Sequence, residues 1–427
     1  MLVLEPQMNT FFSWDISHER IIMPNARRTS TPPEAVVLSQ RVLEGLLKDI
    51  RECMDRYLPI FKRSDIGETA SEYVLGLLSG LPRKSAEPIS EIFEQERKVF
   101  QRFVGESPWN DSQVRQELLL DVTENIGDPD GVLCFDPSSF PKKGKASVGV
   151  ARQWCGRLGK KENCQTGVFA SYASPKGRCL AESQLALPAE WIEDKARRKK
   201  ARIPVDRVYL THWELADELY WKVRDLPHAC ILADPELGRC GKWRDRLASR
   251  GEWYALNIPS NLDIRIVDRG VVIPAPHKVS EWVASRPRSD WLRVQTRMGS
   301  QGPMVFNVYA TEVATLRNDD SLRRETLLAY HPVETPGDIK YALIRMPPGT
   351  SLERMIQFVT RRWTIEDCFE VAKTECGMDQ YEVRSWVGWH HHMTMSMLAL
   401  WFLKKLHIAR KGAFSPSDGP DDCIGVG

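Results

Sequence analysis

The chain has 427 residues, of which 42% are hydrophobic and 27% are charged, and its formal net charge is +2. This composition is typical of a folded globular protein and excludes collagen-like, low-complexity and intrinsically disordered chains. The length exceeds the size at which one hydrophobic core keeps growing, so two or three domains are expected. The small net charge by itself indicates no class of partner.

The ten cysteines include no Cys-x-x-Cys pair, which argues against a zinc ribbon, and their scattered positions indicate no disulfide framework. We interpret them as reduced thiols in a cytosolic protein. The N-terminus lacks the charged leader and long apolar run of a secretory signal. The most apolar stretch, residues 393–403, is about eleven residues long, too short to span a bilayer, and it predicts a core helix.

The N-terminal third of the sequence is mixed at first and then helical in pattern. Residues 1–33 end in a run rich in Arg, Thr, Ser and Pro and are expected to form a flexible tail. Over residues 34–126 apolar side chains recur at helical spacing, as at Leu47, Ile50 and Met54. We expect a small helical N-terminal domain, which serves either ligand recognition or packing and dimerisation.

Two short apolar runs within residues 127–258 predict buried central strands. Residues 132–135 lead to Asp136, and residues 229–233 lead to Asp234. In open α/β sheets functional sites gather at the carboxyl ends of strands, so the two carboxylates are expected to lie near each other. Each aspartate also precedes a proline, and an isolated Asp-Pro more often only caps a turn.

Between the two aspartates the sequence predicts a hairpin and a helix. Residues 165–172 and 178–187 flank a Pro-Lys-Gly segment, which predicts a hairpin turn one residue longer than the tightest kind. Thr211 and Glu214 have the spacing of a capping box at the start of a helix. The order strand, hairpin, helix, strand indicates the first part of an α/β core over residues 127–258.

The 131 residues between Asp234 and Glu366 are too many for a simple strand-helix-strand connection. Residues 259–348 contain several short strand-like pieces and predict a β-rich insertion that interrupts the core. A helix is expected to begin near Thr350 and to carry Glu366. Residues 349–410 are then the C-terminal part of the core, and residues 411–427 are a second flexible tail.

Basic residues are concentrated in one segment. Residues 137–202 contain 15 Lys and Arg against 5 Asp and Glu. Such a surface attracts phosphates and makes binding strongly dependent on salt. For residues 197–200 taken alone, a solvated basic helix remains an equal alternative.

Arg362, Glu366 and Lys373 are spaced i, i+4 and i+11, so on one helix they share a face. An ordinary solvated helix has the same pattern, but Glu366 also offers a third carboxylate to Asp136 and Asp234. Three carboxylates without histidine or thiolate favour Mg²⁺ or Mn²⁺. Two such ions roughly 3.5–4 Å apart can activate a water or a 3′-hydroxyl and stabilise the leaving oxygen of a phosphodiester.

Three further features narrow the choice of chemistry. Asp367 and Glu370 compete with Glu366 as the third acid, but the helical spacing from Arg362 favours Glu366. The consecutive histidines 390–392 point about 100° apart on a helix, so they cannot converge on one ion. Neither a P-loop nor a Gly-x-Ser-x-Gly elbow is present, so a nucleotide cofactor and serine hydrolase chemistry have no support.

The third-acid region resembles a known motif. Arg362, Glu366 and Lys373 match the Tyr-x₂-Arg-x₃-Glu-x₆-Lys spacing of bacterial insertion-sequence transposases of the Asp-Asp-Glu type, in the cut-and-paste group, with Val359 at the tyrosine position. Other stretches also resemble this group of DDE-superfamily endonucleases, and the likeness covers roughly residues 40–405. These stretches are residues 81–85, 101–109, 135–145, 233–238 and 381–386.

The resemblance implies an α/β fold: a ribonuclease H-like catalytic core, interrupted by the β-rich insertion and preceded by an α-helical, DNA-binding N-terminal domain. It implies metal-dependent cleavage at transposon ends and strand transfer into target DNA by this mobile-element enzyme. The implied catalytic and metal-binding residues, for two Mg²⁺ or Mn²⁺ ions, are Asp136, Asp234 and Glu366. The implied DNA-binding residues are Arg362, Lys373, Lys142 and Lys143.

The same resemblance implies double-stranded DNA, both transposon ends and target, as the partner of a homodimer. It implies a bacterial, cytoplasmic, nucleoid-associated protein with no membrane partner and no nucleotide cofactor. Family members often carry a second acid and Thr-Gly after the first aspartate and a Gly-Tyr-Gly type of turn after the second. This chain has Pro137-Ser138-Ser139 and residues 235–238 there.

These departures support an alternative: a catalytically inactive, transposase-derived protein that binds DNA and acts in regulation or targeting. The presence of Asp136, Asp234 and Glu366 favours the enzyme, because a catalytically inactive site has no chemical need for three acids. A third class, a protein-interaction module built on the insertion, has no positive sign in the sequence.

Overall fold

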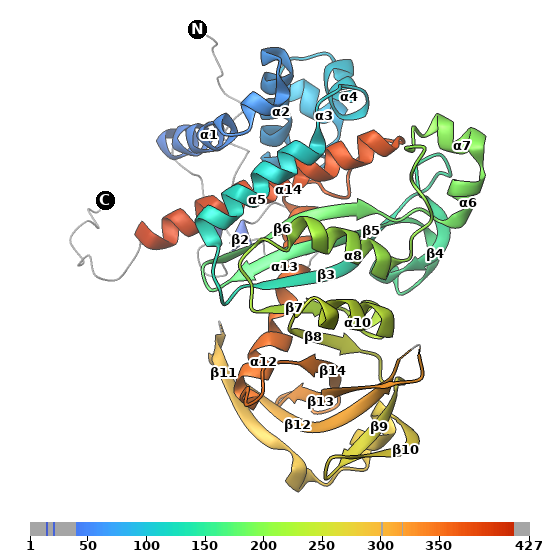
Figure 1. Cartoon of the computed structure of the whole chain (residues 1–427). Coiled ribbons are helices and arrows are strands. Elements are labelled where there is room, and N and C mark those ends of the chain that lie inside the picture. The colour runs from blue at the N-terminus through green and yellow to red at the C-terminus, as the bar shows by residue number, and fades with distance from the viewer. Residues whose placement is uncertain (1–13, 16–19, 22–39, 300–301, 318, 414–427) are drawn as a thin grey trace, which may run out of the picture. The chain divides into compact units, whose positions relative to one another are not determined.

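The computed structural model describes residues 14–15, 20–21, 40–299, 302–317 and 319–413. The chain divides into two compact units, one formed by residues 1–125 and 369–427 and the other by residues 126–368 (Figure 1). Most of the two predicted flexible tails lies outside the described residues. The exceptions are the strand pair β1 (Trp14–Asp15) and β2 (Arg20–Ile21) and residues 411–413, which end the C-terminal helix α14 (Trp386–Ala413).

After the strand pair β1 and β2, the described N-terminal part of the first unit is helical. Its N-terminal elements are α1 (Gln40–Asp55), η2 (Leu58–Phe61), α2 (Ser64–Leu78), α3 (Ala86–Ile92), α4 (Arg97–Gly105) and α5 (Asp111–Ile126), the last of which ends at the unit boundary. Ile50 and Met54, predicted from their spacing to face a core, are buried. Asp121, also buried, accepts hydrogen bonds from Tyr57, Trp401 and Lys405, and so ties α5 to the segment between α1 and η2 and to the C-terminal helix.

The C-terminal helix α14 (Trp386–Ala413) belongs to the same unit, because it packs on α1, α2 and α4. The predicted core helix at residues 393–403 is confirmed, and its side chains from Met393 to Phe402 are buried. No helix in the described part of the chain is long and apolar enough to cross a membrane. The domain division predicted from the sequence placed residues 349–410 together, whereas the contacts in the structure group residues 369–410 with the N-terminal helices. The finer division of the chain into six segments remains a prediction.

The second unit is built on a mixed sheet of twelve strands among the described residues. The strands are β3 (Val132–Pro141), β4 (Ala151–Cys155), β5 (Lys160–Ser174), β6 (Gly177–Leu185), β7 (Cys230–Ala233), β8 (Tyr254–Ile258), β9 (Asp263–Asp268), β10 (Val271–Lys278), β11 (Leu292–Gly299), β12 (Gly302–Leu316), β13 (Leu322–Pro332) and β14 (Lys340–Arg345). Their order is β10-β9-β12-β13-β14-β8-β7-β3-β5-β4, with β11 beside β12 and β6 beside β5.

The centre of this sheet contains its parallel pairs. β3 and β7 are parallel, β7 and β8 are parallel, and β5 runs antiparallel to β3 and β6. β7 and β8 are apolar or buried throughout, as expected for strands covered on both faces. The β5–β6 turn is tighter than predicted, because Ser174 pairs with Gly177 and only Pro175 and Lys176 form the loop.

Helices of the second unit connect and cover these strands (Figure 1). They are η3 (Gly156–Leu158), α6 (Ala189–Glu193), α7 (Lys195–Lys200), α8 (His212–Val223), α9 (Pro235–Gly238), α10 (Gly241–Ser249), α11 (Val279–Ala284), η4 (Arg288–Asp290) and α12 (Leu352–Arg361), and α13 (Trp363–Thr374) runs across the boundary between the units. The predicted capping box begins α8, where the Glu214 carboxylate accepts from the Thr211 amide at 2.9 Å.

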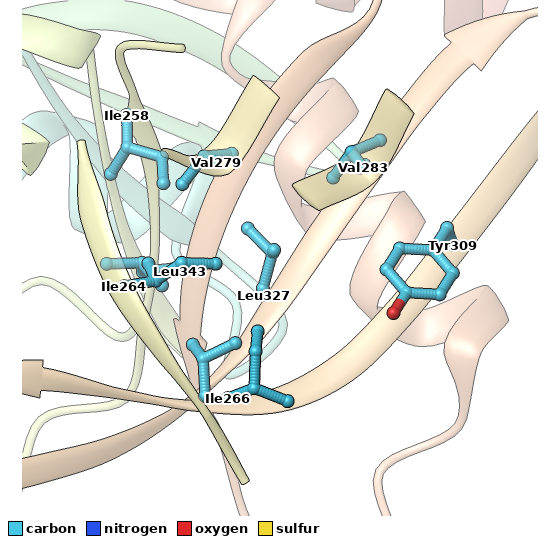
Figure 2. Close-up of a cluster of buried hydrophobic side chains, with 10 residues drawn as sticks. Ile258, Ile264, Ile266, Val279, Val283, Tyr309, Leu327 and Leu343 are labelled. Carbon is cyan, nitrogen blue, oxygen red and sulfur yellow. The ribbon is translucent and has the colours of Figure 1, made fainter. Parts of the chain in front are cut away.

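The predicted β-rich insertion consists of β9 to β14 with α11. It does not form a separate sheet, because β14 pairs antiparallel with β8 and so extends the central sheet. Ile258, Ile264, Leu327 and Leu343 form its hydrophobic core together with side chains from α11 and β12 (Figure 2). The insertion and the central strands therefore share one continuous hydrogen-bonded framework.

Candidate active site

Asp136 and Asp234 occupy equivalent places on neighbouring parallel strands. Phe135 of β3 is in register with Ala233 of β7, so each aspartate is the next residue along its strand. β7 ends at that point, but β3 continues to Pro141 because β5 still supplies a hydrogen-bonding partner. The sequence predicted Asp136 at the end of a strand. In the structure it lies within β3, level with the point where the parallel strand β7 ends.

Asp234 also begins the short helix α9, where its Oδ1 accepts a hydrogen bond from the Leu237 amide at 3.0 Å. The helix lies very close to β8: a Cβ added at Gly238 would be 1.9 Å from the Asn257 carbonyl oxygen. Only glycine fits there. This contact fixes α9, and with it the direction in which the Asp234 carboxylate leaves the sheet.

Both aspartates carry a proton more readily than ordinary carboxyls. Burial raises the pKa of Asp136 well above its usual range, the negative charge of Asp234 raises it further, and Arg362 opposes the rise. The pKa of Asp234 is raised to about 6, mainly by burial. The hydrogen bond from the Leu237 amide opposes this rise, and the negative charge of Glu236 adds to it. Negative charge is thus concentrated here, and a bound cation would relieve it.

Arg362 connects Asp136 to Glu366. Its Nη1 donates to Asp136 Oδ2 at 3.0 Å, and its Nη2 donates to Glu366 Oε1. Asp136 has only 15% of its side chain exposed, whereas Glu366 has 57% exposed. The structure therefore brings Asp136 and Glu366 together through a shared guanidinium, and places Glu366 on the solvent side.

The helix expected to carry Glu366 is broken into two. α12 begins at Leu352, capped by Ser351 and not by Thr350, and α13 begins at Trp363. Arg362 separates them but keeps helical dihedrals of φ −56° and ψ −30°. Its spacing of four residues from Glu366 therefore still produces an ion pair, as the sequence predicted.

The competing acids and the other predicted cations lie in different surroundings. Asp367 accepts from Arg178 Nε of β6 at 2.7 Å, so its charge is engaged with that strand. Glu370 and Lys373 lie on the part of α13 that belongs to the other unit, where the Lys373 Nζ is 5.3 Å from the Phe369 ring centroid.

Lys142 and Lys143 lie just beyond the end of β3. They are six and seven residues past Asp136, which in an extended strand is roughly 20 Å. The structure therefore does not gather them with the three acids. Lys143 is exposed, and the Lys142 amide donates to the Asn163 carbonyl at 2.9 Å.

Sequence reasoning missed His212 and Glu236 beside the aspartates. His212 Nδ1 lies 2.6 Å from Glu236 Oε1, and this hydrogen bond lowers the pKa of Glu236. The charge of Glu236 in turn raises the pKa of Asp234. The capping box placed His212 at the start of a helix, but no local pattern joins two residues that are 24 positions apart.

The acidic side chains of this site meet some of the requirements for binding a hard divalent cation. In the part of the chain that the structure describes, no three His, Cys, Asp or Glu side chains are arranged as a metal-binding group. Asp136 and Asp234 offer hard oxygen donors in a place where burial and neighbouring charge disfavour two carboxylates without a cation. Glu366 is held to Asp136 by Arg362 and would complete the donor set.

Comparison with known proteins gives one family match. No curated protein matches the chain. Among solved structures, the NurA nuclease from Sulfolobus solfataricus is similar at 11% identity and a TM-score of 0.25, covering 78% of this chain and 98% of the nuclease. A profile described as DDE superfamily endonuclease matches residues 56–301, more than half of the chain and a range that includes Asp136 and Asp234. The chain belongs to the DDE superfamily endonucleases.

Proposed function

We propose that the protein is a DNA transposase that cuts DNA at the ends of a mobile element and joins those ends to a target. The observation that carries the proposal is the adjacency of Asp136 and Asp234 on parallel strands, with Glu366 linked to Asp136 by Arg362. Family membership supports endonuclease chemistry with DNA as substrate. A homodimer acting on two element ends in the bacterial cytoplasm is part of the same proposal.

The order of the central strands supports a ribonuclease H-like core. β6, β5 and β3 are consecutive antiparallel neighbours, and β7 and β8 then follow β3 in parallel. The chain crosses from β6 to β7 through α8 and from β7 to β8 through α9 and α10. The insertion of β9 to β14 then separates β8 from the helices that carry Arg362 and Glu366.

In this proposal Asp136, Asp234 and Glu366 would hold two Mg²⁺ or Mn²⁺ ions, which would activate the attacking oxygen and stabilise the charge on the leaving one. Arg362 releases its carboxylate partners and binds the phosphate backbone near the scissile bond. Phosphoryl transfer needs little covalent help from protein, so positioning and charge supply most of the rate. Lys142 and Lys143 are DNA contacts farther from the cut, and Lys373 is a further DNA contact.

The test is cleavage of a plasmid that carries the native element ends, with Mg²⁺ or Mn²⁺ and with a chelator. We expect metal-dependent cutting that falls at least about 100-fold in Glu366→Gln, because a metal ligand is removed. Glu353→Gln is the matched control, since Glu353 is an exposed glutamate in the first turn of the preceding helix. Equal cutting by both variants would remove Glu366 from the proposed site.

The ion pairs of Arg362 favour a second candidate. A guanidinium already lies between two of the three acids, and its positive charge offsets part of their negative charge without any metal. A transposase descendant with this arrangement binds DNA but does not cut it. Salt-sensitive binding of the element ends, without cutting in either divalent metal, would favour this candidate over the enzyme.

A further inference from the structure

A hairpin formed by β4, η3 and the start of β5, residues 151–162, extends past the part of the sheet that carries the aspartates. Asp136 pairs with Phe169 of β5, whereas β4 pairs with the beginning of that long strand. Lys161 is eight residues from Phe169, which along an antiparallel strand is roughly 27 Å. The tip of the hairpin is therefore a separate surface from the candidate active site.

The hairpin exposes large apolar side chains among cations. Trp154 is 61% exposed and Leu158 is 44% exposed. Residues 151–162 contain four Lys and Arg against one Glu, a net charge of +3. All four of those cations are exposed: Arg152, Arg157, Lys160 and Lys161.

The pairing of the strands sets which side chains share a face. Trp154 is directly opposite Lys161, and Arg152, two residues earlier, points to the same face. Gln153 is half-buried and Cys155 is buried, so the opposite face is the covered one. The exposed face therefore presents an aromatic ring between two cations.

A second basic segment lies against the hairpin. Asn163 Nδ2 donates to the Gly144 carbonyl at 2.9 Å and so holds the loop that contains Lys143 and Lys145 beside β5. Arg197 of the basic helix α7 donates to the Lys145 carbonyl at 3.0 Å. We call the six cations of the hairpin and loop the basic hairpin surface: Lys143, Lys145, Arg152, Arg157, Lys160 and Lys161.

The backbone beneath this surface is held by buried hydrogen bonds. Gln165 Nε2 donates to the Val148 carbonyl at 2.5 Å, and Trp191 Nε1 donates to the Val150 carbonyl at 2.8 Å. Both donor side chains are buried. A ligand would thus meet a surface whose backbone is already ordered, which reduces the entropy cost of binding.

We propose that the basic hairpin surface binds the phosphate backbone of duplex DNA, with Trp154 and Leu158 contacting the groove between the two strands. Charge complementarity selects DNA, and exposed apolar side chains among cations suit contact with sugars and base edges. The distance of roughly 27 Å corresponds to about eight base pairs from the scissile phosphate. The hairpin proposal depends on the proposed transposase function in one respect only, namely that this phosphate is the one that is cut.

The test measures binding of a labelled duplex carrying one element end, over a range of salt concentrations. The four hairpin cations are changed together to glutamine and compared with a matched control on the insertion. The hairpin variant is Arg152→Gln, Arg157→Gln, Lys160→Gln and Lys161→Gln, and the control is Lys278→Gln, Arg286→Gln, Arg324→Gln and Lys340→Gln. The slope of log K against log salt should fall by about 0.9 for each phosphate that the protein no longer neutralises, and only in the hairpin variant.

Trp154 is tested on its own. Trp154→Ala should weaken duplex binding at least about five-fold, and Trp154→Phe should retain most of the affinity, because an aromatic ring preserves the contact. Hydroxyl-radical footprinting should show protection about eight base pairs from the cut in the wild type, and this protection should disappear in the hairpin variant.

The outcomes separate the two proposals. Hairpin-dependent duplex binding without any cutting supports the hairpin proposal and contradicts the transposase. Cutting by the wild type, with equal salt slopes in the hairpin and control variants, overturns the hairpin proposal and leaves the transposase. A wild-type protein that binds anionic vesicles but not duplex DNA also overturns the hairpin proposal.

Discussion

Asp234 has two roles that can be separated by one substitution. Its side chain caps α9, and its charge lies in a buried place near Glu236 that raises its pKa to about 6. Because the folded pKa is above the ordinary value, the folded state binds more protons than the unfolded state between about pH 4 and pH 6. The free energy of unfolding therefore falls as the pH rises through that range.

Asp234→Asn keeps an oxygen that can cap the helix and removes the charge. We expect it to raise the free energy of unfolding by about 1–3 kcal/mol at pH 7 in the presence of a chelator. The gain should disappear below about pH 4, where Asp234 is protonated in both states. Thermal unfolding of both proteins at the two pH values measures this, and a less stable variant at pH 7 would contradict it.

Arg362 links two acidic residues of the site that are far apart in the sequence. It contacts Glu366 within its own segment and Asp136 from a strand 226 residues earlier. The first contact follows from helical spacing and was predictable from the sequence. The second depends on where the helices lie against the sheet, and no local pattern indicates it.

At the scale of elements, a buried ionic network joins α10 to the insertion. Arg244 Nε lies 3.0 Å from Glu325 Oε1 of β13, and both side chains are almost fully buried. Tyr254 and Thr315 donate to the same carboxylate. Arg244 also donates to the Gly238 carbonyl, so the network extends to the helix that Asp234 caps.

Glu325→Gln leaves Arg244 buried without the charge that balances it, whereas Arg323 keeps its ion pair with Asp245. We expect the free energy of unfolding to fall by about 3–5 kcal/mol, because removal of one partner from a buried ion pair leaves the other charge buried without compensation for its desolvation. The control is Glu312→Gln on the adjacent strand, an exposed glutamate paired with Arg324, with an expected decrease of about 0–1 kcal/mol. Urea unfolding of both variants tests this, and equal decreases would mean that burial does not decide the effect.

The three consecutive histidines of α14 illustrate a geometric prediction at this scale. His391 stacks on Trp109 with ring centroids 3.7 Å apart, and burial lowers its pKa. His392 contacts the Tyr73 hydroxyl at 2.9 Å, while His390 contacts the Trp386 carbonyl at 3.0 Å. The rings point to different neighbours, as a rotation of about 100° per residue requires.

At the scale of the second unit, the insertion is part of the main sheet. β8 lies between β7 and β14, so the insertion supplies one whole side of its hydrogen bonds. The hydrophobic cluster that includes Ile258 of β8 and Leu343 of β14 also crosses this join (Figure 2). The central strands therefore depend on the insertion for a covered edge.

A variant in which a short linker replaces residues 259–348 should lose this edge and aggregate. Exposed edge strands pair with other chains, and β8, which is largely apolar, would lose its β14 partner and become an edge strand in such a variant. Size-exclusion chromatography and circular dichroism of the purified variant measure the outcome. A monomeric variant with a cooperative unfolding transition would show that the insertion is an independent domain.

The sequence by itself determined the local features of this protein. Apolar runs before Asp136 and Asp234 indicated buried strands, Thr211 and Glu214 marked a helix start, and short strand-like pieces indicated that the insertion is rich in strands. These features depend on neighbouring residues, whose periodicity and capping are read directly from the chain.

Only the tertiary structure decided which of these elements meet. It placed Phe135 in register with Ala233, and so set the two aspartates side by side. It also joined β14 to β8 and brought Arg362 to Asp136. Pairings over such long separations depend on loop closure and on packing of the whole sheet, and the periodicity within a segment does not encode them.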